Sequence, residues 1–237
     1  MGSRKVLVIQ HDADDGLKQF AKPLLLAGLR IETWNVERSA APPKLDGYDG
    51  LIVLGSLASL RTPAASPWIT PERELLQSAL SAQLPTLGIC FGAQHLAQAG
   101  GGAVVPADIP ELGWQEISLE DHARNDVLLK RFPSNFPAFQ WHYDCIQLPA
   151  EAELLATGNA MVQAFRLGDC AWGLQFHLEL DPGGITSWCG SSANELQEQG
   201  IELEPLMANT RLNCEAYAAL ADELIGNFVT VIDGRFP

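Results

Sequence analysis

Short apolar runs alternate with segments of helical spacing along the first half of the chain. Four of these runs predict strands, at residues 5–10, 30–34, 50–54 and 84–90. Apolar positions three and four residues apart predict helices over residues 16–27, 71–82 and 93–99. The second of these helices is expected to begin after Thr70. Because continuous apolar strands are typical of parallel sheets covered on both faces, this half predicts a parallel sheet between two helical layers.

The second half of the chain has a less regular pattern. Residues 100–121 are rich in turn formers and predict only short strands. The runs at 161–166 and 170–176 predict a hairpin that returns to the sheet. Helical spacing resumes in two segments near the end, residues 185–199 and 210–229. The predicted fold class is therefore α/β: an open, mostly parallel sheet with helices on both faces, plus a small antiparallel sheet or hairpin extension.

The chain is long enough for one domain with a full core. It has 237 residues, of which 47% are hydrophobic, and no repeat or linker divides them. We expect a single domain over residues 1–237, with a helical C-terminal segment of about 183–237 packed on it. Residues 183–209 lie beyond the motifs described below, so they are expected either to cap a pocket or to dock a partner.

The charge balance excludes several classes of partner. The net charge is −14, from 15 basic and 29 acidic residues, and the basic residues are scattered. Phosphate groups require clustered Lys and Arg, so we expect neither nucleic acid nor a membrane surface as a partner. No run of eighteen apolar residues occurs, and the apolar run at 6–9 is too short for a signal peptide. These features predict a cytoplasmic protein.

Cysteine usage points to a reducing compartment. The five cysteines are widely spaced, their number is odd, and no C-x-x-C pattern occurs. Neither a disulfide framework nor a zinc site is predicted. We therefore expect no metal and no cofactor.

One cysteine stands in a pattern that indicates a reactive thiol. Cys90 lies between Gly88 and Gly92, directly after an apolar run and directly before a predicted helix. This is the layout of a nucleophile elbow, a sharp strand-to-helix turn that leaves little room for Cβ atoms. The amides at the start of the helix would favour the thiolate. The alternative is a cysteine buried in a strand, a common environment for this residue, and the flanking glycines argue against it.

A cysteine nucleophile needs a base and a group that orients the base. His177 and Glu179 follow an apolar run, two residues apart. If the strand continues through them, the alternation of side chains puts both on the same face, so the carboxylate can reach the imidazole. A histidine in such a place is often purely structural, but its coincidence with the Cys90 pattern favours a catalytic pair.

An acyl-transfer site also needs donors for an oxyanion. The backbone amide of Phe91 follows the cysteine and is the first candidate. The apolar run 50–54 ends in Gly55-Ser56-Leu57, a loop expected beside the elbow in a parallel sheet. Gly55 alone is equally compatible with an ordinary strand-to-loop connection.

Together these segments resemble a class I glutamine amidotransferase domain, most similar to stand-alone proteins akin to the amidotransferase half of GMP synthetase. The resemblance covers roughly residues 5–182. The matching pieces occur in the family's order, at residues 54–56, 88–94, 111–114, 141–144, 162–165 and 175–179. The elbow together with His177 and Glu179 is specific to the family, whereas each of the other pieces is weak alone.

The resemblance implies a reaction and a set of site residues. It implies that Cys90, His177 and Glu179 form a catalytic triad that hydrolyses the γ-amide of glutamine through a glutamyl thioester. The oxyanion would lie between the amides of Phe91 and Ser56. The resemblance further implies substrate-binding residues near one pocket, namely Gly55, Gln94, His142, Tyr143 and Asp144. His142 is also compatible with a packed loop residue.

Three positions depart from the family pattern. Gly55-Ser56-Leu57 replaces the usual Gly-Gly-Pro, and Ser56 would be strained by about 1 kcal/mol or more if its φ were positive. Leu178 replaces a proline and is expected to leave the His177–Glu179 pairing intact. Tyr143 replaces a glycine and is expected to place a ring where the substrate backbone would lie.

These departures leave more than one function open. The leading prediction is an enzyme that hydrolyses glutamine or a different γ-glutamyl compound, a small molecule, and releases ammonia or an amine. It would act alone, or it would pass ammonia to a separate synthetase partner. A binding or regulatory protein that retains the fold is the rival class, and the complete set of triad residues argues against it.

Overall fold

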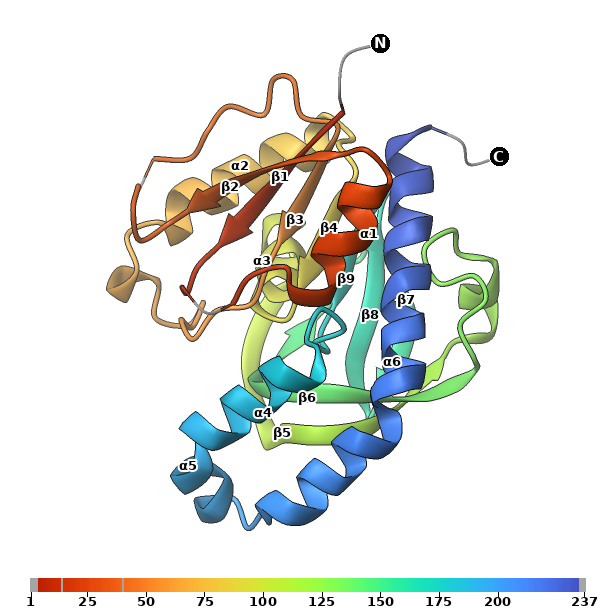
Figure 1. Cartoon of the computed structure of the whole chain (residues 1–237). Coiled ribbons are helices and arrows are strands. Elements are labelled where there is room, and N and C mark those ends of the chain that lie inside the picture. Colours follow the sequence, from red (N-terminus) through yellow and green to blue (C-terminus); the bar gives the residue numbers. More distant parts are fainter. Residues whose placement is uncertain (1–3, 14, 40, 235–237) are drawn as a thin grey trace.

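One twisted sheet runs through the molecule (Figure 1). The computed structural model describes residues 4–13, 15–39 and 41–234, and in this part of the chain the sheet has nine strands. Their order is β2-β1-β3-β4-β9-β8-β7-β5-β6. The bounds are β1 (Lys5–Gln10), β2 (Arg30–Asn35), β3 (Gly50–Val53), β4 (Thr86–Ile89), β5 (Ala103–Leu119), β6 (Asn135–Gln147), β7 (Ala152–Gly158), β8 (Met161–Leu167) and β9 (Ala171–Leu174).

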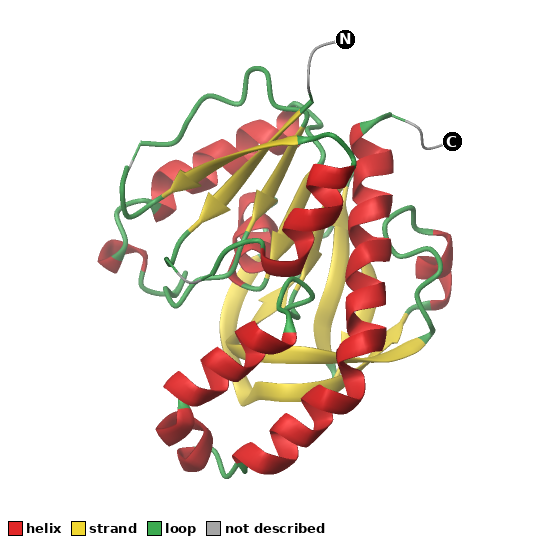
Figure 2. Cartoon of the chain, in the orientation of Figure 1, coloured by secondary structure: helices red, strands yellow, loops and turns green. Residues whose placement is uncertain are grey.

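Helices cover both faces of the parallel part of the sheet. Their bounds are α1 (Ala21–Leu26), α2 (Ile69–Ser81), α3 (Phe91–Ala99), α4 (Pro182–Ser191), α5 (Ala193–Glu198) and α6 (Leu203–Ile232), with 3₁₀ turns η1 (Lys18–Phe20), η2 (Pro63–Ala65) and η3 (Asp121–Asn125). Helices α1 and α6 contact each other in front of the sheet, and α2 and α3 pack together behind it (Figures 1 and 2). Across the described residues, no helix has both the length and the apolar character needed to cross a membrane.

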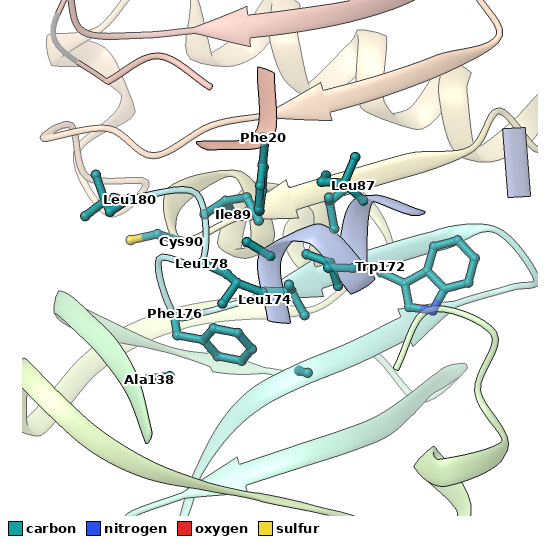
Figure 3. Packing of buried hydrophobic residues seen from close by; sticks show 14 of the residues in the cluster. Phe20, Leu87, Ile89, Cys90, Ala138, Trp172, Leu174, Phe176, Leu178 and Leu180 are labelled. Atoms are coloured by element: carbon teal, nitrogen blue, oxygen red, sulfur yellow. The ribbon is translucent and has the colours of Figure 1, made fainter. Parts of the chain in front are cut away.

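Strand β1 shows why the strands at the centre of the parallel part of the sheet are mostly apolar. Val6 and Val8 belong to the core cluster beneath α1 and α6, whereas Leu7 and Ile9 belong to the cluster beneath α2 and α3. Successive side chains point to opposite faces, so a strand covered on both faces needs apolar residues at every position. Figure 3 shows part of the first cluster, with Cys90 at its edge and its sulfur pointing away from Ile89 and Leu174.

The predicted fold class is confirmed, although the antiparallel part of the sheet is larger than expected. Strands β2, β1, β3, β4 and β9 are parallel neighbours, and β8 and β9 form the predicted hairpin. The antiparallel part is larger than a small extension, because β5 spans 17 residues and β6 spans 13.

The prediction for residues 100–121 is wrong. Instead of short strands, β5 pairs with β6 along most of its length, with a shift in register between Pro106 and Glu111. In β5 the apolar Ile109 is exposed and the charged Glu111 is buried, and two prolines interrupt the alternation further, so the apolar pattern is broken although the strand is not. Strands β6 and β7 have no counterpart in the sequence prediction; in β6 the buried positions include Gln140, His142 and Asp144, which break its apolar pattern.

Several helix boundaries also differ from the sequence prediction. The helix expected over 16–27 begins only at Ala21, because Lys18 has a φ of +44°. Helix α2 begins at Ile69 with no side-chain cap, so Thr70 does not cap it. The helix expected over 185–199 is two helices that meet at Ser192. The last helix, by contrast, is longer than the predicted 210–229.

Within the described residues 183–234, the helical segment contacts the rest of the fold through α6. Helix α6 contacts α1, β5 and β6, and α4 contacts α6. Residues 1–3 and 235–237 of the predicted domain lie outside the described residues.

Candidate active site

Cys90 lies on a sharp turn between β4 and α3. Its backbone has φ +51° and ψ −107°, a conformation that a residue with a Cβ rarely adopts. A Cβ on Gly88 would lie 2.6 Å from the carbonyl oxygen of Gly92, and a Cβ on Gly92 would overlap the carbonyl of Val53. Both glycines are therefore needed because other backbone atoms approach them closely, whereas the positive φ belongs to the cysteine itself.

The Cys90 thiol is fixed by contacts on two sides. Its Sγ lies 3.8 Å from the carbonyl oxygen of Trp141, toward which the thiol donates. The side-chain amide of Gln175 lies 3.7 Å from Sγ and donates to it. The backbone amide of Cys90 bonds the carbonyl of Leu174 at 2.8 Å, so the turn is anchored to β9. A thiolate would keep the Gln175 donor and the N-terminus of α3, both of which favour negative charge.

His177 and Glu179 form a buried hydrogen-bonded pair. Nδ1 of His177 lies 2.7 Å from Oε1 of Glu179, and the two residues are 2% and 4% exposed. A carboxylate can only accept, so Nδ1 carries the proton and Nε2 is left for other chemistry. Nε2 makes no hydrogen bond within the described part of the chain.

The pairing does not arise from strand alternation, as the sequence argument assumed. Strand β9 ends at Leu174, and residues 175–180 form a tight loop. Gln19 holds this loop from the other side, because its side-chain amide donates to the carbonyls of Leu178 and Leu180. The sequence offered no signal for Gln19, which lies about 160 positions away and acts through backbone groups.

The surroundings of His177 favour its charged form. Burial lowers the pKa of His177, but the Glu179 carboxylate and the Cys90 thiolate outweigh burial and raise that pKa well above its ordinary value. The ring of Trp188, from α4, meets the imidazole edge to face with a centroid distance of 4.9 Å. An imidazolium beside the cysteine is therefore electrostatically stable in this site.

Gly55 lies against both the cysteine and the histidine. A Cβ on Gly55 would lie 3.2 Å from Cε1 of His177 and 3.9 Å from Cβ of Cys90. The backbone amides of Ser56 and Phe91 make no hydrogen bond within the described residues. Ser56 is not among the residues with positive φ, so the strain considered for it does not arise. Two free amides thus border the cysteine, as an oxyanion requires.

A cavity of about 380 Å³ opens over the cysteine. The lining comes from the loops after β1, β3, β4 and β9, from β6 and from α4. Among the described residues it includes Asp12, Ala13, Asp15, Ser56, Leu57, Cys90, Trp141, His177, Ser187, Trp188, Ser191 and Ser192. Within the described ranges no group of three His, Cys, Asp or Glu side chains could hold a metal ion. Helix α4 closes one side, which is the capping role considered for residues 183–209.

None of the five expected substrate-binding residues is among the described residues that line this cavity, although Gly55 lies directly behind Cys90 and His177. Gln94 is buried behind the cysteine, where its amide donates to Gln175 Oε1 at 3.2 Å. His142 bonds the carbonyl of Asp144 and lies 2.9 Å from the Glu111 carboxylate. Asp144 pairs with Arg61 at 2.8 Å.

Tyr143 is 39% exposed, and its hydroxyl donates to Glu195 of α5. The expectation that its ring would occupy the space of the substrate therefore has no support in this geometry. The contact instead ties β6 to α5, at the outer end of the helical segment that closes the cavity.

A second buried cluster supports the loop at Gly55. The carboxylate of Glu72, on α2, bridges His11 Nε2 at 2.8 Å and His95 Nδ1 at 2.9 Å, and all three side chains are fully enclosed. The other ring nitrogen of His11 lies 2.9 Å from the carbonyl of Gly55. Burial raises the pKa of Glu72, but His11 and His95 overcome that effect and lower it to about 2. Sequence patterns could not reveal this cluster, because Glu72 is 61 positions from His11 and 23 positions from His95.

The chain is similar in sequence to several known proteins. The profile described as glutamine amidotransferase class-I matches residues 12–186. The chain is 29% identical, over 67% of its length and 68% of the relative's, to the glutamine amidotransferase-like protein YfeJ of Salmonella typhimurium. It is 36% identical to a glutamine-hydrolysing GMP synthase of Porphyromonas gingivalis, over 59% of this chain but only 26% of that protein.

Two further similarities complete the comparison. A γ-glutamyl-L-1-hydroxyisopropylamide hydrolase of a Pseudomonas species is 27% identical over 66% of this chain and 55% of that protein. Among solved structures, a glutamine amidotransferase of Thermotoga maritima superposes with a TM-score of 0.87 at 24% identity, covering 97% of this chain and 99% of the other. This structural similarity shows the fold.

Proposed function

Because the chain belongs to the class-I glutamine amidotransferase family, we propose that it hydrolyses the γ-amide of glutamine or of another γ-glutamyl compound at Cys90. The resemblance drawn from the sequence motifs is thereby confirmed at the level of the family. Family membership supports enzyme activity. We further propose that Cys90, His177 and Glu179 act as its catalytic triad.

The proposed reaction proceeds through a thioester. The Cys90 thiolate attacks the γ-amide carbon, and the amides of Phe91 and Ser56 stabilise the oxyanion that forms. The imidazolium of His177 gives its Nε2 proton to the departing ammonia or amine, which leaves a γ-glutamyl thioester on Cys90. Neutral His177 then takes a proton from water as the water oxygen attacks the thioester. Glutamate is released, and Glu179 keeps the imidazole oriented throughout.

The observation that carries the proposal is the arrangement of one cavity. The thiol of Cys90 and the imidazole of His177 line it together, two unbonded amides border the cysteine, and Glu179 holds His177 from behind. A protein that only binds a ligand would not require a cysteine at φ +51° beside a histidine held in one tautomer.

The identity of the substrate separates two versions of the proposal. The Pseudomonas relative is named for hydrolysis of a γ-glutamyl amide, which favours an enzyme that acts alone. The GMP synthase relative is named as glutamine-hydrolysing, which favours glutamine as substrate and a separate synthetase as the acceptor of ammonia. The matched region spans about a quarter of that synthase, so the synthase's whole activity does not transfer directly. We propose one domain over the whole chain in either version.

A substrate screen tests the proposal. Release of ammonia or amine is measured with glutamine, γ-glutamyl dipeptides and γ-glutamyl alkylamides, for the wild type and for Cys90→Ser. We expect hydrolysis of at least one compound, and a loss of at least about 10⁴-fold in kcat/KM for Cys90→Ser. Cys214→Ser on α6 is the matched control and is expected to keep full activity. Binding without hydrolysis for every compound would contradict the proposal and favour the regulatory alternative.

A further inference from the structure

The cavity over Cys90 has an acidic wall, and His177 is the one basic side chain among the described residues that line it. Asp12 and Asp15 are the carboxylates among its lining residues, and the described lining contains neither Lys nor Arg. Both aspartates lie in the loop between β1 and η1, where the amide of Asp15 bonds the carbonyl of Asp12 at 3.2 Å. A site made only to hold a carboxylate would present the opposite charge.

Asp12 is fixed in place and retains a free oxygen. Its Oδ2 accepts a hydrogen bond of 3.1 Å from the amide of Leu57, in the loop that carries Ser56. No hydrogen bond reaches Oδ1 from the described residues. The aspartate is thus held against the proposed oxyanion loop, with one acceptor left for a ligand.

Asp15 is a partly buried carboxylate without a bonded partner. No hydrogen bond or ion pair to its side chain occurs within the described ranges. Burial raises the pKa of Asp15 to about 6, the charge of His177 opposes this rise, and the carboxylates of Asp12 and Glu179 add to it. Lys18 also lowers it slightly. The charged form of Asp15 is therefore incompletely compensated by the protein groups around it.

The imidazole of His177 is a second, independent observation that indicates a ligand in this cavity. Nε2 of His177 is buried, makes no hydrogen bond within the described chain, and belongs to a side chain that lines this cavity. The reacting amide would approach this nitrogen, in the cavity that Asp12 and Asp15 also line. A ligand that brings positive charge would satisfy Asp15 without displacing His177.

We propose that Asp12 and Asp15 bind a primary ammonium group of the substrate and so determine specificity for positively charged γ-glutamyl compounds. This inference rests on the proposed function. The ammonium belongs either to the α-carbon of the glutamyl group or to the amine that leaves. An ammonium between two carboxylates gains two charge-assisted hydrogen bonds, which a neutral analogue cannot make.

Two matched pairs of substrates test the proposal and separate the sources of the ammonium. The first pair is γ-glutamyl 4-aminobutylamide and γ-glutamyl butylamide, which differ in the charge of the leaving amine. The second pair is γ-glutamyl butylamide and its Nα-acetyl derivative, which differ in the charge at the α-carbon. For the wild type at pH 7.5, one pair at least should show a preference for the charged member of roughly 10- to 100-fold in kcat/KM.

The aspartate variants show whether that preference depends on this wall. Asp15→Asn keeps the shape but removes the charge, and it should reduce the preference to within about threefold. Asp12→Asn should reduce it in part, and Asp121→Asn, an exposed aspartate on η3, should leave it unchanged. Thermal melting establishes that each variant is folded.

The pH dependence supplies an additional readout. Protonation of Asp15 removes its charge, so the preference for the charged member should decline as the pH falls through about 6. The readout is the ratio of kcat/KM between the charged and the neutral member of a pair. Titration of Cys90 and His177 affects both members equally, so it does not change this ratio. A ratio near one in both pairs, or a preference unchanged in Asp15→Asn, would overturn the inference while leaving hydrolysis itself intact. Hydrolysis of glutamine without hydrolysis of any of these compounds would likewise overturn the inference, whereas no hydrolysis of glutamine or of any of these compounds would reject the proposed function.

Discussion

The backbone of Cys90 shows how a single residue can be strained for chemistry. Its φ of +51° lifts the side chain out of the strand and toward the cavity, while glycines at 88 and 92 let the neighbouring chain approach. The sequence predicts this turn, because two glycines around one cysteine have few other uses. It also predicts that Glu179 meets His177, although the loop that joins them is not a strand.

The glycine at 92 should be required for stability. Gly92→Ala would force a Cβ onto the carbonyl of Val53, and we expect a loss of about 3 kcal/mol or more in the free energy of unfolding, measured in urea. Gly226→Ala is the control, because it lies exposed on α6 with nothing within 4 Å of the added Cβ. It should stabilise the protein by about 0.5–1 kcal/mol, since glycine is unfavourable inside a helix. Equal effects of the two changes would reject the close approach at Gly92.

Glu179 should set the titration of His177. Glu179→Gln removes the negative charge that raises the pKa of His177, so that pKa should fall. The imidazolium is then lost at lower pH, and the alkaline limb of the pH profile of kcat/KM should move toward acid. Activity at neutral pH should fall by roughly 10²–10⁴-fold. An unchanged alkaline limb would show that Glu179 does not act through His177.

The other side chains of the site illustrate what a sequence cannot provide. Asp15, Trp141 and Trp188 come from three distant segments and meet only in the folded cavity. Conversely, Gln94 and Tyr143 stand beside recognisable motifs, yet their contacts lie elsewhere, with Gln175 and Glu195. Local motifs are sufficient to identify the reacting groups. The side chains that form the walls of the cavity come together only through tertiary packing.

At the scale of secondary-structure elements, predictions are best where both faces of an element are buried. Strands β1 and β3 match their predicted bounds to within one residue, because all buried positions of both strands are apolar. Strands β5 and β6 are long but partly exposed, and their polar residues conceal them. The pattern of apolar residues likewise does not show that α4 and α5 are separate helices. Polar, exposed residues occur on both sides of Ser192, where the two helices meet.

The bridge made by Glu72 should hold three elements together. Glu72→Gln removes the charge that His11 and His95 share, and we expect a destabilisation on the order of 3 kcal/mol. Glu74→Gln is the matched control, since it makes the same change at an exposed position of α2 and should cost less than about 0.5 kcal/mol. Urea unfolding followed by circular dichroism compares them. A similar loss in the free energy of unfolding for both variants would mean that the buried bridge contributes no more to stability than an exposed charge on α2.

At the scale of the whole molecule, the alternation of strands and helices is sufficient to predict the fold class. The order of the strands is not, because β9 enters the sheet beside β4 after a long antiparallel excursion. That insertion brings the loop with His177 next to the turn with Cys90. The site therefore depends on the complete sheet rather than on either half.

The buried bridge also predicts how the whole molecule responds to acid. Glu72 has a folded pKa of about 2, below its ordinary value of 4.5, so its contribution to stability is full above about pH 4.5. That contribution should be lost as the pH falls from there toward 2. Thermal melting between pH 7 and pH 2.5 measures this, with Glu72→Gln as the comparison. The variant should show a smaller decline than the wild type over the acid range, and parallel declines would assign acid sensitivity to other groups.

The most direct test of the central claim is covalent labelling of the nucleophile. The protein is incubated with 6-diazo-5-oxo-L-norleucine, a reactive analogue of glutamine, and the modified residue is located by peptide mass spectrometry. The account predicts one adduct, on Cys90, that is absent in Cys90→Ser and forms more slowly in His177→Ala. Labelling of Cys145 or Cys214 in place of Cys90, or no labelling of a protein that hydrolyses γ-glutamyl amides, would contradict it.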